Sequence, residues 1–156
     1  MPPKYVNTAK FEATRRDRHI EGEVGIWMKV QCTGVRLLVL AATDANPAFV
    51  DLFPKMQAEL RRLEGVGADK DEIDTVRARY YTRMFVRDWG DVEAADGGPA
   101  RFSVDACTEY LAYSHDSATE LAETVFETRR FRMALAQQTV EDLKAFSDGT
   151  APGEST

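Results

Sequence analysis

The clearest pattern of apolar and polar positions lies between residues 24 and 40, where apolar side chains recur at every second position. The first run holds Val24, Ile26, Met28 and Val30, and the second holds Val35, Leu37 and Val39. A short turn at residues 32–34 separates the runs. An alternation of period two on both sides of a short turn predicts a β-hairpin. A hairpin alone is barely stable in water, so it must pack on helices or gain strands.

Helical spacing replaces this alternation after residue 45. Asp44 or Asn46 can cap a helix that starts at Pro47 and ends near Gly65. Its apolar positions are Phe49, Phe53, Met56, Leu60 and Leu63. Pro54 removes one backbone hydrogen bond, so we expect a kink or a restart of the helix there.

A second helix is predicted to begin at Asp69 or Asp71, because early acidic residues suit the positive end of the helix dipole. The apolar face of this helix holds Ile73, Val76, Tyr80 and Met84. We expect the helix to end in Trp89.

Two further helices are predicted in the last third of the chain. Ser103 is placed to cap a short helix that runs through Leu111. Ser117 and Glu120 have the spacing of a capping box, which predicts the start of a last helix that runs to about Phe146. The apolar positions of that helix are Leu121, Val125, Leu135, Val140 and Leu143.

These elements predict an α+β fold, with an N-terminal β-hairpin or small antiparallel sheet packed on a mostly helical domain of four or so helices. Residues 1–20 are polar and basic without a clear period, and we expect a basic N-terminal arm. Residues 21–147 are predicted to form a single α+β domain, which suits a chain of 156 residues. Residues 148–156 have no apolar anchor and are predicted to be a flexible polar tail.

Charge and hydropathy narrow the range of functions. The net charge of −6 and the pI near 5.0 argue against a general nucleic-acid binder, since phosphate affinity comes mainly from clustered Lys and Arg. The longest apolar run, at residues 35–42, is far shorter than the ~20 residues that a membrane span needs. Cys32 and Cys107 form no CxxC pair, which is typical of two reduced thiols in a cytoplasmic protein. We therefore expect no nucleic-acid partner, no membrane partner and a cytoplasmic location.

Motifs of catalysis and metal binding are not found in the sequence. There is no glycine-rich phosphate loop and no paired-histidine zinc motif. His115 beside Asp116 is interpreted as a solvated histidine next to a helix cap. The acidic run that starts at Asp69 fails as a calcium loop, because Asp74 and Tyr80 stand where such a loop needs Gly and Glu. We therefore expect no enzyme activity, no cofactor and no metal site.

The connection after the second helix combines features that fix a chain direction. Trp89 offers a large ring for burial, and Gly97 with the following glycine allows a positive φ. Pro99 stiffens the exit, and Phe102 is placed for a hydrophobic staple just before the Ser103 cap. We interpret the stretch as a structural elbow that sets the angle between two helices, and not as an active site.

Three features occur together and in order. An acidic lead runs into an aromatic strand and its hairpin partner, an Asn-Pro helix start with a following Phe comes at residues 46–49, and the elbow comes third. The elbow positions concerned are Trp89, Gly90, Val92, Asp96, Gly97, Pro99, Phe102 and Ser103. In these features the chain resembles the small tail assembly chaperones of long-tailed bacteriophages, over roughly residues 20 to 135. It departs from them in its long basic arm and in the extra Gly98.

The resemblance implies a small protein of the infected host cytoplasm that works during tail morphogenesis. Such chaperones coat the tape measure protein, help to recruit tail tube subunits and act in many copies. The resemblance therefore implies the tape measure and tail tube proteins, and copies of the chain itself, as partners. Tyr81, Phe85, Phe126 and Phe131 fall off the apolar helix stripes, and our hypothesis is that they supply part of the partner-binding surface.

The alternative is a permanent structural protein of the virion: a head–tail connector, a tail component or a capsid cement protein. The arm and the polar tail would suit that role, because such segments become ordered by lying on neighbouring subunits. The protein would then be located in the virion.

Overall fold

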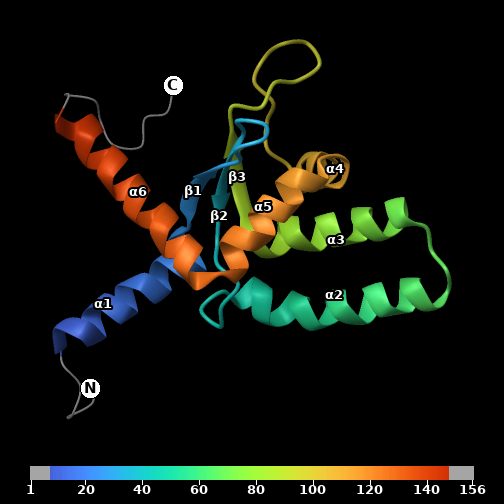
Figure 1. Cartoon of the computed structure of the whole chain (residues 1–156), viewed down its shortest axis with the longest axis horizontal. Coiled ribbons are helices and arrows are strands. Elements are labelled where there is room, and N and C mark those ends of the chain that lie inside the picture. The colour runs from blue at the N-terminus through green and yellow to red at the C-terminus, as the bar shows by residue number, and fades with distance from the viewer. Residues whose placement is uncertain (1–7, 148–156) are drawn as a thin grey trace.

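A computed structural model describes residues 8–147 and shows an α+β domain (Figure 1). Part of the predicted arm, residues 1–7, and the whole predicted polar tail, residues 148–156, lie outside the described residues. The elements in chain order are α1 (Thr8–His19), a π-helical turn (Ile20–Val24), β1 (Ile26–Lys29), β2 (Arg36–Val39), α2 (Pro47–Gly65), α3 (Lys70–Phe85), β3 (Val86–Gly90), α4 (Val104–Tyr113), α5 (His115–Phe126) and α6 (Thr128–Ser147). The predicted fold class, a small antiparallel sheet with a mostly helical domain, is confirmed.

The predicted hairpin forms the first two strands of the sheet. β1 and β2 pair antiparallel with Ile26 opposite Val39 and Met28 opposite Leu37. These four side chains are buried, whereas Trp27, Lys29, Arg36 and Leu38 point to the other face. The alternation in the sequence therefore becomes one face toward the core and one face away from it.

β3 was not predicted, and the prediction that the second helix extends to Trp89 was wrong. The helix α3 ends at Phe85, and the chain continues directly into β3, which pairs antiparallel with β2. Trp89 lies opposite Leu37 in this pairing. The strand supplies hydrogen-bond partners to the second edge of β2, and this gain outweighs further helix in a segment whose helical pattern had become weak.

Asn46 joins three elements at the centre of the domain. It caps α2, because its Oδ1 accepts a hydrogen bond from Phe49 N, and Pro47 occupies the first helical position as predicted. Its fully buried amide also donates to the carbonyl oxygens of Ala41 and Met84, at 3.0 and 2.9 Å. The exit from β2, the start of α2 and the end of α3 are therefore held by one side chain.

The helix α2 lies antiparallel to α3 and packs on it (Figure 1). Of the predicted kink or restart at Pro54, the restart does not occur: α2 is a single helix, and Pro54 lies on its exposed side. Asp69 caps α3 by accepting a hydrogen bond from Glu72 N, as predicted.

The last predicted helix is two helices. Ser114 caps α5, not Ser117, and Ser117 is buried within the first turn, where it accepts a hydrogen bond from the Tyr110 hydroxyl. Glu127 leaves the helical conformation, with φ −99° and ψ 105°, and separates α5 from α6. The backbone near this break is held to the sheet side, because Ala42 N donates to Val125 O.

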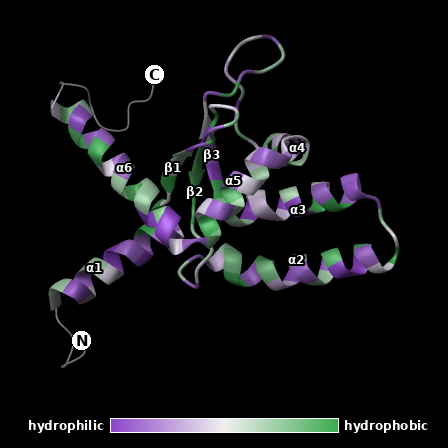
Figure 2. Cartoon of the chain, viewed as in Figure 1, coloured by the Kyte–Doolittle hydropathy of each residue, from purple (hydrophilic) through white to green (hydrophobic). Residues whose placement is uncertain are grey.

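Two helices project from the domain on the same side of Figure 1, and they contribute fewer buried residues to the core than the other helices. The described part of the predicted arm is helix α1, which Figure 2 shows as mainly hydrophilic. The π-helical turn fixes it to the domain: Ala41 N donates to Glu21 O, and a Cβ on Gly22 would lie 1.8 Å from Ala45 O. The other projecting segment is the C-terminal half of α6, which we call distal α6. None of the described helices is long and apolar enough to cross a membrane.

Candidate protein-binding groove

Two of the four aromatic residues predicted to bind a partner are core residues. Phe85 is 0% exposed and Phe131 is 1% exposed, so neither ring can offer a binding surface, and that part of the hypothesis is corrected. Phe85 lies on the inner face of α3, and Phe131 is the residue through which α6 is anchored. Phe126, by contrast, is 41% exposed, and Tyr81 is partly buried.

An aromatic cluster surrounds Phe126 at the end of α5. Its ring centroid lies 5.5 Å from Phe85, 5.8 Å from Phe53, 6.0 Å from Phe49 and 6.3 Å from Tyr81. These distances and the tilted or edge-on ring angles are those of favourable aromatic pairs. Phe126 therefore covers the buried Phe85 and leaves part of its own ring at the surface.

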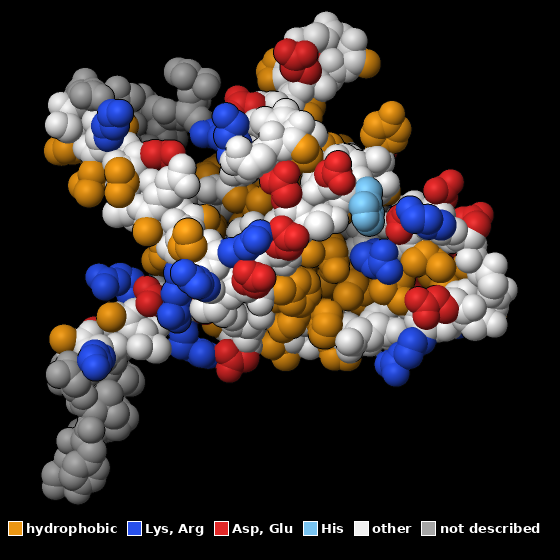
Figure 3. All heavy atoms as spheres, viewed as in Figure 1, with side chains coloured by type: hydrophobic (Ala, Val, Ile, Leu, Met, Phe, Trp, Pro, Cys, Tyr) orange, Lys and Arg blue, Asp and Glu red, His pale blue; other side chains and the backbone are white. Residues whose placement is uncertain are grey.

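A cavity of about 290 Å³ lies beside this cluster, between α3, α4 and α5. Most of its lining is apolar, and Tyr81 belongs both to the cavity and to the aromatic cluster. The small lining residues are Ala78, Ala112, Ala118 and Ala122. We call the cavity and the adjoining rings Phe53, Tyr81 and Phe126 the aromatic groove. Figure 3 shows hydrophobic side chains gathered over this region between α2 and α5, with charged side chains around them.

Charges of both signs line the rim of the aromatic groove. Asp74 pairs with Lys70 at 2.8 Å and with Arg77 at 3.3 Å, and the hydrogen bond from Lys70 lowers the pKa of the Asp74 carboxyl. Glu123 pairs with Arg130 at 2.7 Å. Burial raises the pKa of Tyr81, so its phenol stays neutral in the groove. The arrangement can accept apolar side chains in the middle and either sign of charge at the edge.

The predicted elbow exists, but it joins a strand to a helix. It connects β3 to α4, not two helices, because Trp89 lies on β3. The Trp89 ring packs edge-on against Phe102 at 5.7 Å, and its Nε1 donates to Ala100 O at 2.9 Å. The hydroxyl of Ser103 accepts from Ala106 N, which confirms the predicted cap of α4.

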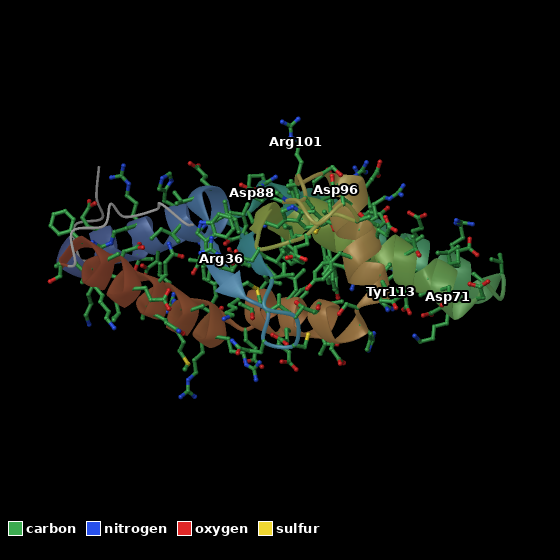
Figure 4. The ribbon with its side chains drawn as sticks, turned by 90° about the horizontal axis from the view of Figure 1, so that it is seen from above. Arg36, Asp71, Asp88, Asp96, Arg101 and Tyr113 are labelled. Atoms are coloured by element: carbon green, nitrogen blue, oxygen red, sulfur yellow. The ribbon has the colours of Figure 1, made fainter. Side chains whose placement is uncertain are left out.

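The loop within the elbow is a small hairpin of its own. Gly97 adopts φ +84°, and Pro99 forms an isolated bridge with Glu93. The Asp96 side chain accepts a hydrogen bond from Gly98 N, which closes the turn. Figure 4 shows Arg101 pointing away from the domain. The loop is held by its own hydrogen bonds and gathers no groups for chemistry.

A second cleft, of about 690 Å³, lies between the sheet and the helices α5 and α6. The Arg36 guanidinium lies over the Trp27 ring at 5.1 Å. Gln138 from α6 accepts a hydrogen bond from Trp27 N at 2.8 Å, on the edge of β1 that no described strand covers. Glu120 accepts from Gln31 N and Cys32 N. These contacts hold the hairpin to the C-terminal helices.

Groups that could act as nucleophiles or metal ligands are scattered. Within residues 8–147 no three His, Cys, Asp or Glu side chains lie where they could share a metal ion. Cys32 is exposed, while Cys107 is buried, and burial raises the pKa of the Cys107 thiol to about 11. His115 lies on the rim of the aromatic groove and is exposed. That the protein is not an enzyme and takes no cofactor stays a prediction.

Sequence reasoning found two members of the aromatic groove and missed the others. Phe53 was assigned to the core stripe of α2 together with Phe49, which packs against Phe85 of α3. The alanines of the cavity carry no signal of their own in the sequence. Comparison with known proteins adds no relative: no protein-family model, no curated protein and no solved structure matches the chain.

Proposed function

We propose that the protein is a tail assembly chaperone of a bacteriophage, which holds amphipathic helical segments of the tape measure protein in the aromatic groove and helps to bring in tail tube subunits. The observation that supports this most is the groove itself. It offers partly exposed rings and an apolar cavity bordered by charges of both signs. A helix with one apolar stripe flanked by Lys and Glu has the complementary surface.

The groove is formed before any partner binds. Phe126 is held by four neighbouring rings, so binding a helix requires little reordering of the groove. A cavity of about 290 Å³ can receive only a few side chains, which favours modest affinity at each site. Many copies along one tape measure protein would then supply strong total binding that is still reversible. Such a protein would act in the host cytoplasm.

A groove-filling variant tests the proposal without removing core packing. Ala122→Arg places a long charged side chain in the cavity, and Ala58→Arg places the same side chain on the exposed face of α2 as the matched control. Each variant is coexpressed with the tape measure protein from the same phage genome, and the soluble tape measure protein is measured. The original chain and Ala58→Arg should keep it soluble, and Ala122→Arg should lose most of that effect with an unchanged melting temperature. No gain of soluble tape measure protein with the original chain would refute the function.

The second candidate is a permanent virion component, and the two projecting helices favour it. Most side chains of α1 and of distal α6 are exposed in the isolated chain, as expected of segments that lie on neighbouring subunits. Mass spectrometry of purified particles separates the candidates. Stoichiometric presence would establish a structural component of the virion, whereas absence would support the chaperone.

A further inference from the structure

The helix α6 has two apolar faces, and only one of them packs on the domain. Phe131 is 1% exposed and anchors the inner face, with Leu135 and Ala134 partly buried beside it. The other face carries Met133 and Val140, each 63% exposed, and Leu143, 67% exposed. Met133 also lines the cleft beside the sheet, but most of the surface of all three side chains stays exposed.

The second face has the spacing of a helix-pairing seam. Met133, Ala136, Val140 and Leu143 follow one another at intervals of three, four and three residues, which is the a/d pattern of paired helices. We call these four residues the α6 seam. Other exposed apolar side chains, such as Val50 on α2, Val66 just after it and Tyr113 on α4, lie singly and need no partner. The α6 seam differs because its members are consecutive along one helix face and include no charged residue.

We propose that the α6 seam is covered by the α6 seam of a second copy, in an antiparallel pair with twofold symmetry. A twofold axis near Gln138 places Met133 of each copy against Leu143 of the other, and Ala136 against Val140. Large side chains thus meet in the outer layers, and a small one meets a larger one in the two middle layers. The seam is therefore complementary to itself, as a twofold interface requires.

Charge selects the antiparallel orientation. The first five residues of α6 include Arg129, Arg130 and Arg132, whereas the distal half carries Glu141 and Asp142 against the single Lys144. A parallel pair would bring the arginines of both copies together and align the two helix dipoles. An antiparallel pair places each set of arginines beside the negative end of the other helix. Arg129 has no acidic partner among the described residues and is available for that contact.

The position of α6 leaves room for a second copy. Its distal half extends away from the sheet and from the pair α2 and α3 (Figure 1). The Gln138 contact to Trp27 N lies on a different side of the helix from the seam. Pairing therefore needs no displacement of an internal contact. It also goes beyond the proposed function, because the aromatic groove is not part of the seam and a dimer would present two grooves.

Oligomeric state tests the proposal directly. Sedimentation velocity of the full chain over a concentration series should show a monomer–dimer equilibrium. Val140→Glu with Leu143→Glu should weaken dimerisation at least 100-fold and leave the melting temperature of the dilute monomer unchanged, since both side chains are exposed. The matched control, Val66→Glu with Tyr113→Glu, should dimerise like the original chain. A monomer at every concentration, or a dimer that survives the seam variant, would overturn the proposal.

Disulfide trapping tests the orientation. In a Cys32→Ser background, which removes the exposed thiol, Met133→Cys and Leu143→Cys are made as two separate chains. Antiparallel pairing predicts cross-linked dimers mainly when the two chains are mixed. Efficient cross-linking in a sample that contains only one of the two variants would overturn the antiparallel arrangement. A chain that stays monomeric, but whose seam variant no longer solubilises the tape measure protein, would assign the seam to that partner and overturn self-pairing. The function tested through Ala122→Arg would stand in either case.

Discussion

The helices α3 and α6 are both amphipathic, but they use their apolar residues differently. α3 buries Ala78, Thr82, Met84 and Phe85 between α2, α4 and the sheet. α6 is longer, at 20 residues against 16, yet it fully buries only Phe131. Apart from the partly buried Leu135, its other large apolar side chains lie at the surface. The comparison separates two uses of one sequence pattern: α3 stabilises the domain, whereas distal α6 has a surface that the domain does not need.

The same truncation in the two helices should give the largest contrast. Phe85→Ala removes a fully buried ring that contacts Phe49, Tyr81 and Phe126, and we expect a loss of about 4 kcal/mol in the free energy of unfolding. Leu143→Ala, measured in dilute solution, should change it by less than about 0.5 kcal/mol. Urea denaturation of both variants checks this. Equal losses would show that distal α6 belongs to the cooperative unit and would remove the distinction.

The Asn46 junction should be the most sensitive polar position in the domain. Asn46→Ala removes a helix cap and leaves the buried carbonyls of Ala41 and Met84 without a donor, so we expect a loss of roughly 3 kcal/mol. Asp69→Ala is the matched control, because it removes only the exposed cap of α3 and should cost about 1 kcal/mol. Guanidinium denaturation compares the two. Similar losses for the two variants would mean that the hydrogen bonds from Asn46 to Ala41 and Met84 add no stability beyond the helix cap.

The free energy of unfolding should depend on pH through the buried Cys107 thiol. Its pKa is raised by burial to about 11 in the folded protein, so the unfolded chain loses this proton first as the pH rises above its ordinary value of 9.0. The stabilisation from the protonated thiol is fully present below pH 9 and should be lost between pH 9 and 11, to a total of about 3 kcal/mol. Cys107→Ala should flatten this part of the stability profile, measured by denaturation at each pH. An unchanged slope would contradict the assignment.

The parts of the fold that could be predicted from the sequence depend on local signals. The alternation at Ile26, Met28, Leu37 and Val39 specified a hairpin and its buried face. Side-chain oxygens of Asn46, Asp69 and Ser103 cap the helices that they were expected to cap, because capping depends on residues only three positions away. These features need no knowledge of the rest of the chain.

The missed features depend on distant partners. Val86 to Gly90 forms a strand because β2, about 50 positions earlier, has an edge to pair, and nothing within the segment reveals that edge. Phe85 lies off the simple helical stripe but is buried because rings from α2 and α5 pack against it. Phe131 also lies off the stripe of its helix and is buried. The groove was therefore predictable only in part. Tyr81 and Phe126 could be found as aromatic residues outside the helix stripes. The cavity could not, because it forms only where α3, α4 and α5 come together.

The contact between Gln138 and Trp27 also has a consequence for folding during synthesis of the chain. Trp27 N–H on the open edge of β1 finds its acceptor 111 residues later in the sequence. Ribosomes add about 5–20 residues per second, so the nascent hairpin waits on the order of ten seconds for that glutamine. During this interval the unprotected strand can pair with a neighbouring nascent chain on the same messenger RNA. The helix α6, the last of the described helices, therefore covers part of the strand edge that β1 leaves unpaired.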